Sequence, residues 1–561
     1  MNKIEKTWWK EAVVYQIYPR SFKDSNGDGI GDLQGIISKL DYIKSLGIDV
    51  VWLNPVYSSP NDDNGYDISD YQNIMSEFGT MEDFDELLKG MHERGIKLVM
   101  DLVVNHSSDE HFWFKESRKS RENPYRDYYH WVNAEDGKPA PRWSFFDPEG
   151  DAWKYDEATN AYYLHYFSQK QPDLKWENPK LRHEIYDMMH YWFKKGIDGF
   201  RMDVITFISK DLSYPPIPEK YQGKMWDYFY ASGERLHEYL HEMNREVLSK
   251  YDIMSVAEGP GTSIENVLDF VDADRNELNM SYHFDHAYLG LLPRKVAAEE
   301  GWKLVDLKAI FTRWDKALAE KGWGTIYFGN HDQPRMVSRW GNDSPEWRAL
   351  SSKMLTTFLL SMRGTPYYYQ GDEIGMSNIK FDTIEDYRDI ETINWYNLTK
   401  KEGGDLEQFL SSHKITARDN GRTPIQWDNS SNGGFSNTTP WIKVNPNYET
   451  VNVANQENDP DSVLNYFRKI TKLRKLNPVL IYGKYTLLDQ DNPDTYCYTR
   501  ELDDTKVVVM LNFKPKKALV DLGINISKTE ILISNYNETI TQKSNGEIVL
   551  NPFHAVILEL N

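Results

Sequence analysis

Three short apolar stretches of the chain each end in polar side chains that could take part in catalysis. They are residues 199–203 (Gly-Phe-Arg-Met-Asp), 256–258 (Val-Ala-Glu) and 329–332 (Gly-Asn-His-Asp). Together they supply three acids, an arginine and a histidine. Cleavage of a glycosidic bond needs two carboxyl groups, one to attack the sugar carbon and one to protonate the leaving oxygen. The residue types therefore indicate this chemistry, provided that the fold brings the three stretches to one rim.

The first 480 residues alternate between strand-like and helix-like patterns. Strands are predicted at 13–18, 49–53, 97–104, 197–203, 253–258, 279–284, 325–329 and 365–370. Helical spacing lies between them at 34–45, 82–94, 179–194, 232–249, 303–321 and 346–362. Gly47 and Gly95 are placed to end the first two helices. Eight such units predict an α/β fold, a closed (β/α)8 TIM barrel, and the acids fall at the carboxyl ends of its strands, where barrels carry their active sites.

Two long segments interrupt the alternation, and a third region ends it. Residues 106–175, rich in Trp, Tyr and Pro, predict a small domain inserted after strand 3. Residues 373–435 form a polar, irregular excursion after the eighth strand. From about residue 481, short alternating runs predict a C-terminal antiparallel β-sandwich. The expected domains are a catalytic barrel at 1–105 and 176–480, an inserted domain at 106–175 and a C-terminal β domain at 481–561.

The composition is that of an ordinary globular protein with an acidic balance. Hydrophobic residues make up 40%, charged residues 27%, and the formal net charge is −21. This charge argues against nucleic-acid and anionic-membrane partners, and no apolar run approaches the length of a membrane span. Cys497 is the one cysteine, and residues 1–10 carry no apolar signal segment. We expect a cytoplasmic protein that is a monomer or a weak homo-oligomer.

Several motifs, in order along the chain, resemble the signature regions of the α-amylase superfamily (glycoside hydrolase family 13). They are 101–106 (Asp-Leu-Val-Val-Asn-His), 199–203, Glu258 and 330–332. Residues 171–179 and the opening 8–22 are similar to the versions found in the oligo-1,6-glucosidase subgroup. The resemblance covers nearly the whole chain. It implies that the partner is a small oligosaccharide substrate and that no organic cofactor is needed.

The resemblance also implies a role for each acid. Asp203 is the expected nucleophile, kept ionised by Arg201 two residues earlier on the same side of the strand. Glu258 is the expected acid/base, and its pKa must be raised by burial or by nearby carboxylates. Asp332 resembles the third acid, which binds ring hydroxyls and distorts the sugar. The residues alone leave alternatives open: a structural Asp–Arg pair, a surface glutamate and a helix N-cap before Pro334.

Further residues are expected to bind the sugar. His106 and His331 resemble the pair that hydrogen-bonds hydroxyls in the first subsite, and neutral imidazole can both donate and accept. Asp67 and Arg422 resemble the residues that hold the non-reducing glucose, a clamp that would make the enzyme exo-acting. Ordinary core or loop packing is the alternative for the three expected pocket walls, Tyr66, Phe167 and Gln171.

Residues 24–32 (Asp-Ser-Asn-Gly-Asp-Gly-Ile-Gly-Asp) form a separate motif that resembles a calcium-binding loop. Its oxygen-bearing side chains and its central glycine match the spacing of an EF-hand loop, but Gly35 stands where that loop has its glutamate. The expected ligands are Asp24, Asn26, Asp28, the carbonyl of Ile30, and Asp32. We expect a structural Ca2+, with Mg2+ or a metal-free Asx-turn loop as alternatives.

Val204, the residue after the expected nucleophile, bears on the linkage. In the resembled subgroup a valine here accompanies cleavage of α-1,6 bonds, because a branched side chain shapes the space for the leaving sugar. Residues 209–232 and 281–301 depart from the subgroup pattern on the side expected to bind that sugar. The expected function is a retaining, exo-acting α-glucosidase that releases glucose from the non-reducing end of short, α-1,6-linked glucosides.

Other functions stay open. The same covalent intermediate could serve an α-1,4-glucosidase, a sucrose-active hydrolase or a transglycosylase, although residues 335–341 lack the Arg-Leu-Asp-Arg run of sucrose isomerases. Trehalose-6-phosphate hydrolysis would need basic residues near the pocket. A non-catalytic binding subunit is disfavoured because all three acids are present.

Overall fold

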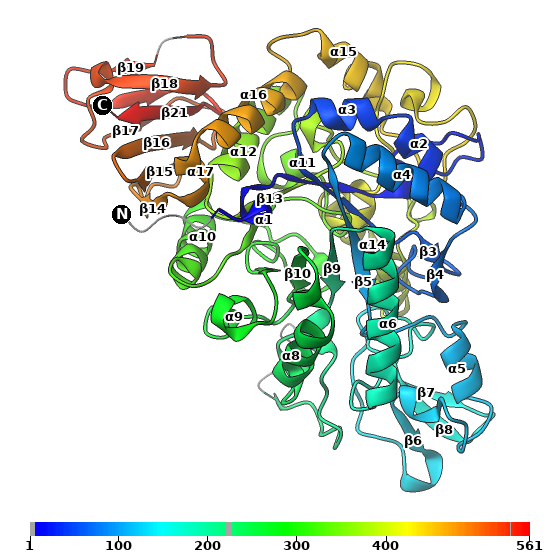
Figure 1. Ribbon diagram of the computed structural model, residues 1–561. Coiled ribbons are helices and arrows are strands. Elements are labelled where there is room, and N and C mark those ends of the chain that lie inside the picture. Colours follow the sequence, from blue (N-terminus) through cyan, green and yellow to red (C-terminus); the bar gives the residue numbers. More distant parts are fainter. Residues whose placement is uncertain (1–5, 148, 220–226, 539, 561) are drawn as a thin grey trace.

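Eight parallel strands form the centre of the molecule. The computed structural model describes residues 6–147, 149–219, 227–538 and 540–560 (Figure 1). The barrel strands are β1 (Val14–Ile17), β2 (Val50–Leu53), β5 (Lys97–Val103), β9 (Gly199–Asp203), β10 (Met254–Glu258), β11 (Met280–Tyr282), β12 (Thr325–Ile326) and β13 (Thr365–Tyr369). They are ordered β11-β10-β9-β5-β2-β1-β13-β12. A parallel bridge between Ser281 and Gly324 joins β11 to the start of β12. The predicted (β/α)8 barrel is confirmed.

Helices cover the outside of the barrel. They include α2 (Leu33–Ile37), α3 (Leu40–Ser45), α4 (Met81–Glu93), α6 (Pro179–Lys195), α8 (Leu236–Glu246), α10 (Leu304–Leu318), α12 (Arg348–Ser361) and α16 (Val463–Leu476). The single helix expected at 34–45 is two helices, since the Ser38 hydroxyl donates to the Gly35 carbonyl (2.6 Å) and competes with the backbone ladder. Gly47 and Gly95 follow helix ends with positive φ of 78° and 68°, as expected for helix stops.

Alternate strand residues point inward and fill the barrel. This core is aliphatic and aromatic, and it contains Val14, Val50, Trp52, Val99, Met254, Val256, Met280, Tyr282, Tyr327 and Tyr367. A filled interior leaves no room for a ligand below the strand ends. Ligand chemistry is therefore confined to the loops at the carboxyl rim. No described helix combines the length and the apolar character needed to cross a membrane.

The long segment after β5 forms a small sheet of its own. It contains α5 (Phe112–Ser117) and the antiparallel strands β6 (Trp131–Asn133), β8 (Ala161–Leu164) and β7 (Trp153–Asp156), in that spatial order. Figure 1 shows it at the bottom of the molecule, beyond β5 and β9. Because β5 runs straight into it, this sheet lies at the carboxyl rim that carries the acids.

The excursion at 373–435 is only partly irregular, which corrects the expectation. It holds α13 (Ile390–Lys401) and α14 (Leu406–Thr416), each with an aspartate side chain as N-cap. In α13 the buried residues are Thr392, Leu398 and Thr399. Two of these three are polar, so the apolar periodicity that predicts a helix is missing from the sequence.

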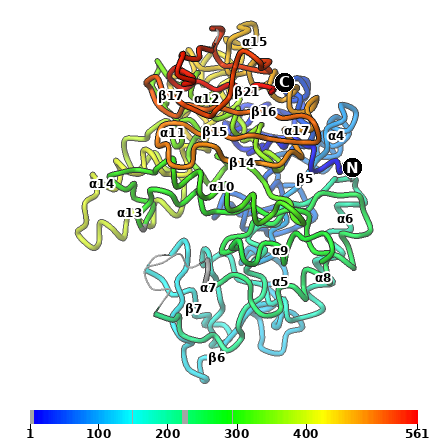
Figure 2. Tube along the Cα trace, turned by 90° about the vertical axis from the view of Figure 1, so that its left-hand side faces the viewer, coloured from blue at the N-terminus to red at the C-terminus, as the bar shows by residue number. Residues whose placement is uncertain are grey.

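The C-terminal strands form two antiparallel sheets. One contains β14 (Lys484–Leu487), β15 (Thr495–Leu502), β16 (Thr505–Asn512), β21 (Ala555–Leu560) and β18 (Thr529–Ser534); the other contains β17 (Ala518–Val520), β20 (Ile548–Leu550) and β19 (Thr541–Gln542). Apolar side chains of both sheets share one core, which includes the buried Cys497. The sandwich is thus confirmed, and Figure 2 shows it at the opposite end of the molecule from β6 and β7. The exact domain limits stay a prediction.

Candidate active site

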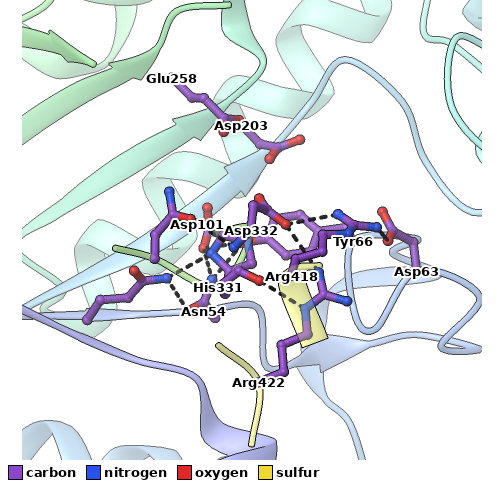
Figure 3. A network of polar contacts seen from close by, with 12 residues as sticks. Asn54, Asp63, Tyr66, Asp101, Asp203, Glu258, His331, Asp332, Arg418 and Arg422 are labelled. Carbon is purple, nitrogen blue, oxygen red and sulfur yellow. Dashed lines mark hydrogen bonds and ion pairs between the residues drawn. The ribbon is translucent and has the colours of Figure 1, made fainter. Parts of the chain in front are cut away.

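The ends of two neighbouring strands place two acids next to each other. β9 ends at Asp203 and β10 ends at Glu258. Arg201 lies between them: its Nη1 is 2.7 Å from Asp203 Oδ1 and its Nη2 is 2.6 Å from Glu258 Oε1. Figure 3 shows the two carboxyls together on one side of a wider polar network. One guanidinium therefore fixes both carboxyls, and each is buried.

The surroundings push these two acids toward different protonation states. Burial raises the pKa of Asp203 to about 6, while the Arg201 guanidinium acts to lower it. Burial raises the pKa of Glu258 to about 8; Arg201 opposes the rise, and the charges of Asp203 and Asp332 add to it. At neutral pH Asp203 is mostly ionised and Glu258 is mostly protonated. A carboxylate beside a carboxylic acid is the pair that a nucleophile and a proton donor require.

Asp332 lies across from this pair among cationic groups. Its Oδ1 is 2.9 Å from Arg418 Nη1 and 3.1 Å from Arg422 Nη2. Burial acts to raise the pKa of Asp332, but His331, Arg418 and Arg422 outweigh it and lower the pKa below its usual range. The side chain is 30% exposed, so an ionised carboxylate faces open space. It is not a helix N-cap, because Arg335 takes that position at α11 (Met336–Trp340).

His331 is neutral, and its hydrogen bonds define which nitrogen is protonated. Burial lowers its pKa to about 3. The Gln16 amide nitrogen, which can only donate, lies 2.8 Å from His331 Nδ1. The ring proton therefore lies on Nε2, 3.1 Å from Asp332 Oδ2. Tyr66 stacks on the imidazole, with ring centroids 5.2 Å apart, so the structure brings both predicted residues to the site.

His106 approaches the same space from the end of β5. Its ring centroid lies 5.1 Å from that of Phe167, which in turn stacks on Phe145. The buried Gln171 side chain donates to Asp63 Oδ2 at 3.2 Å. Tyr66, Phe167 and Gln171 thus contact His331, His106 and Asp63 respectively, and their role as pocket walls stays a prediction.

The structure does not join Asp67 and Arg422 in a clamp. Asp67 is fully buried, and its carboxylate accepts from Ser59 Oγ and from the backbone N–H groups of Asp62 and Asp63. It holds its own loop together. Arg422 does reach the site, but it is buried under it, where it donates to the His331 carbonyl (2.9 Å) and pairs with Asp332.

A different acid and a different arginine occupy the expected place. Arg418 Nη2 lies 3.5 Å from Asp63 Oδ1, and its Nη1 contacts Asp332 (Figure 3). Burial raises the pKa of Asp63 to about 7, although Arg418 acts to lower it. The sequence gives a weak signal for both residues, since each lies within a few positions of a predicted one. Spacing alone did not distinguish them.

Asp101 is another site residue for which the sequence predicts no individual role. Its Oδ1 lies 2.7 Å from Arg201 Nη1, and its Oδ2 accepts from the Trp52 indole at 2.9 Å. This fully buried carboxylate shares the Nη1 of Arg201 with Asp203, and it fixes the guanidinium while Nη2 reaches Glu258. Its position at the start of the 101–106 motif is the signal that could have indicated it.

Val204 has a backbone conformation that is rare for its type. Its φ of 34° lies in the left-handed region, which costs most for a β-branched residue. The strained turn aims the Val204 N–H at Glu258 Oε2, at 3.0 Å. The residue that was expected to shape the leaving-group space therefore also holds the acid.

The loop at 24–32 is compact and polar. Asp24 accepts from the N–H groups of Asn26, Gly27 and Gly29, and Asp28 accepts from the N–H of Ile30. Asp32 caps α2 through the N–H of Gly35. Among the described residues, no group of three or more His, Cys, Asp or Glu side chains is arranged to hold a metal ion. The candidate ligands are all oxygen atoms, which Ca2+ prefers. The presence of the metal stays a prediction.

The barrel, its paired carboxyls and the third acid define a glycoside hydrolase. The chain belongs to the α-amylase family: the family model for the alpha amylase catalytic domain matches residues 16–483, and that for the maltogenic amylase C-terminal domain matches 485–557. It is 54% identical to an oligo-1,6-glucosidase of Parageobacillus thermoglucosidasius and 52% identical to one of Bacillus cereus, in each case over 99% of this chain and 100% of the relative. A mutant isomaltulose synthase of Erwinia rhapontici NX5, solved in complex with D-glucose, has a TM-score of 0.96 at 44% identity and full coverage of both chains.

Proposed function

We propose that this protein is a retaining, exo-acting α-glucosidase that releases glucose from the non-reducing end of short α-1,6-linked glucosides. The observation that carries the proposal is the pair Asp203 and Glu258, held on one guanidinium in opposite protonation states. Full-length similarity to oligo-1,6-glucosidases supports the linkage.

In the first step Asp203 attacks the anomeric carbon while Glu258 passes its proton to the departing oxygen. This leaves a glucosyl ester on Asp203 and an ionised Glu258. In the second step Glu258 takes a proton from water, whose oxygen displaces Asp203. Asp203 and Glu258 contact the two terminal nitrogens of the one Arg201 guanidinium, at 2.7 Å and 2.6 Å, so the two carboxyls lie close together. This closeness supports retention rather than inversion.

The other polar residues of the site are proposed to bind the glucose. Asp332, His106 and His331 present an ionised carboxylate and two neutral imidazoles to ring hydroxyls. Asp63 and Arg418 close the far side of the site. A pocket closed behind one glucose supports exo action, because a longer chain cannot extend past that point.

The direct test is a comparison of initial rates of glucose release from isomaltose, isomaltotriose, maltose, sucrose, trehalose and trehalose-6-phosphate. We expect the isomalto sugars to be preferred. Preference for trehalose-6-phosphate would contradict the proposal. The basic residues in the divergent 281–301 loop argue against that outcome, since Arg294 and Lys295 are paired with Glu402 and Glu391.

Sucrose isomerisation is the second candidate, favoured by the likeness to isomaltulose synthase. Analysis of the sucrose reaction for isomeric disaccharides, alongside free glucose, separates the two functions. The divergent 209–232 loop bears on this choice, but its residues 220–226 lie outside the described part of the chain. Disaccharide products in excess of glucose would favour the isomerase.

Replacing Val204 by threonine should shift linkage preference toward α-1,4 bonds. The side chain packs beside Phe207 and Tyr230 at the rim, and threonine keeps its shape while adding a polar group there. We expect the ratio of kcat/KM for isomaltose over maltose to fall about tenfold, as for a small change in an apolar subsite. An unchanged ratio, with both rates intact, would show that other loop residues set the linkage.

The pH profile should be bell-shaped. Asp203 must be ionised, so kcat/KM should rise as pH increases through about 6. Glu258 must be protonated, so kcat/KM should fall as pH increases through about 8. The two groups interact, and the limbs report the pair rather than either residue alone. An aryl α-glucoside assayed from pH 4 to 10 measures this, and a rate that stays high above pH 9 would contradict it.

We further propose that the 24–32 loop binds a structural Ca2+ through the side chains of Asp24, Asn26, Asp28 and Asp32 and the carbonyl of Ile30. None of the acids at the active site belongs to this loop, so the ion would stabilise the fold without entering the reaction. Chelation with EDTA should lower the melting temperature, and added Ca2+ should restore it more fully than Mg2+. The control is Asp24→Asn, which should lose the response to both; a melting temperature that is insensitive to EDTA in the parent protein would contradict the proposal.

We also propose that the protein is cytoplasmic and that it is a monomer or a weak homo-oligomer. A single buried cysteine and a strongly negative charge support this. Light scattering coupled to size-exclusion chromatography tests the assembly.

A further inference from the structure

A lysine is buried beside the active site, where a charged side chain is costly. Lys210 lies seven residues beyond Asp203, and its side chain is 1% exposed. Its Nζ donates to Asn105 Oδ1 (2.9 Å) and to the Phe207 carbonyl (2.8 Å), and it lies 3.1 Å from Asp173 Oδ2. Two hydrogen bonds and one ion pair therefore hold the buried ammonium group in position.

The ammonium determines how the Asn105 side chain is turned. Because Oδ1 of Asn105 accepts from Lys210, its Nδ2 must face the other way, and it lies 3.1 Å from His106 Nδ1. A flipped amide would place an NH2 group against the ammonium, so the orientation follows from charge. Asn105 is fully buried, which restricts the rotation of its side chain.

The orientation of Asn105 in turn determines the state of His106. An amide nitrogen can only donate, so His106 Nδ1 accepts and the ring proton lies on Nε2. Nε2 lies 3.2 Å from the Tyr66 carbonyl, which accepts its proton, and 3.3 Å from the Gln171 amide nitrogen, which is itself a donor. The shorter contact to the carbonyl and the donor at Nδ1 together favour the proton on Nε2, on the side of the ring that faces the glucose-binding residues. Burial lowers the pKa of His106 to about 3, and the Lys210 charge acts in the same direction, so the imidazole is neutral with a single N–H.

We propose that Lys210 is a positioning residue: through Asn105 it selects the His106 tautomer that carries its proton on Nε2, the nitrogen that faces the glucose-binding residues. The inference rests on the proposed function only in assigning His106 to the sugar. Lys210 itself touches no substrate. Its effect on the reaction passes through two side chains, and each link is a hydrogen bond whose direction is fixed by chemistry.

The chain offers a matched control for the loss of a buried lysine. Lys308 is also fully buried, and its Nζ donates to the carbonyls of Asn492 and Thr495 in the C-terminal region. Lys308→Met therefore removes the same kind of group from a place far from the acids. Any loss common to Lys210→Met and Lys308→Met reports stability alone.

The first measurement is the tautomer itself. In protein labelled with 15N-histidine, the His106 ring nitrogens are identified by their absence in His106→Asn. We expect protonated Nε2 in the parent protein and in Lys308→Met, and a shift toward protonated Nδ1 in Lys210→Met. Asn105→Asp keeps an acceptor for Lys210 but removes the donor to His106, so it should give the Nδ1–H form even if Lys210→Met fails to fold. An unchanged tautomer in Asn105→Asp, or in a folded Lys210→Met, overturns the proposal.

The second measurement is a double-mutant cycle on kcat/KM for isomaltose. Partners that orient metal-ligating histidines are worth about 10- to 100-fold, and by analogy we expect Lys210→Met to lose activity within that range. In the His106→Asn background the same change should cost less than about threefold, because the residue it orients is gone. Equal losses in both backgrounds overturn the proposal. Failure of the proposed function is distinguishable, since it would appear in the parent protein's substrate panel and would leave the tautomer shift unaltered.

Discussion

Asp203→Asn should abolish glucose release from isomaltose, with kcat lowered by roughly 10⁴- to 10⁶-fold, as for loss of other catalytic nucleophiles. The amide has almost the shape of the carboxylate, but it cannot form the ester with the anomeric carbon. Arg201 keeps its contacts with Asp101 and Glu258, so the site should stay assembled. The measurement is single-turnover and steady-state hydrolysis with the melting temperature recorded in parallel.

A buried aspartate far from the site provides the control for this variant. Asp489 accepts from Thr495 Oγ1 and from the Cys497 N–H in the C-terminal domain. Asp489→Asn should lower stability and leave kcat close to that of the parent protein. Hydrolysis by Asp203→Asn at a tenth of the parental rate or more would contradict the assignment of Asp203 as the nucleophile.

Glu258→Gln should lower kcat/KM for isomaltose by about 10²- to 10⁴-fold, the usual worth of a general acid. The leaving sugar is a poor leaving group and needs the proton. An activated substrate such as α-glucosyl fluoride needs none, so formation of the glucosyl ester from it should be slowed far less. The variant also lacks the base for the second step, and added azide should accelerate turnover by attacking the ester directly.

The hydrogen bond from the Val204 N–H can be kept by the glutamine oxygen, so the variant should fold as the parent does. The fall in rate at alkaline pH should disappear, because the group that titrates near pH 8 is gone. Equal losses for isomaltose and for glucosyl fluoride would contradict the acid/base role. If the rate of Glu258→Gln still fell at alkaline pH, that fall would have to be assigned to the titration of another group.

Local features of the sequence were enough to predict the frame of this protein. Each barrel strand is a short apolar run bounded by turn or helix signals, and burial on both faces demands such runs. Asp203 and Glu258 could be placed at strand ends because each directly follows its run. Their convergence then followed from the barrel, in which all parallel strands end on one rim. The C-terminal sandwich was also predictable from a local pattern, because its short strands alternate between apolar and polar residues and are separated by turn residues.

Contacts between irregular segments could not be predicted in this way. Asp63 and Asp67 lie in one loop, and Arg418 and Arg422 lie in another, four residues apart in each case. Side chains in loops have no fixed period, so spacing does not say which of them faces the sugar. The structure turns Asp67 inward to bind its own backbone and turns Asp63 toward Arg418.

The sequence by itself therefore determined the barrel and the sandwich, because these depend on periodicity, and it placed Asp203 and Glu258 at strand ends. The expected roles of the three acids came from the resemblance of their motifs to those of the family. Only the tertiary structure decided the protonation states of Asp203 and Glu258, since burial and the shared Arg201 set them. It alone also brought Lys210 from one loop to Asn105 at the end of another strand. Electrostatic interactions and hydrogen bonds act over a few ångströms in space. The separation of two residues along the chain does not show whether they are that close.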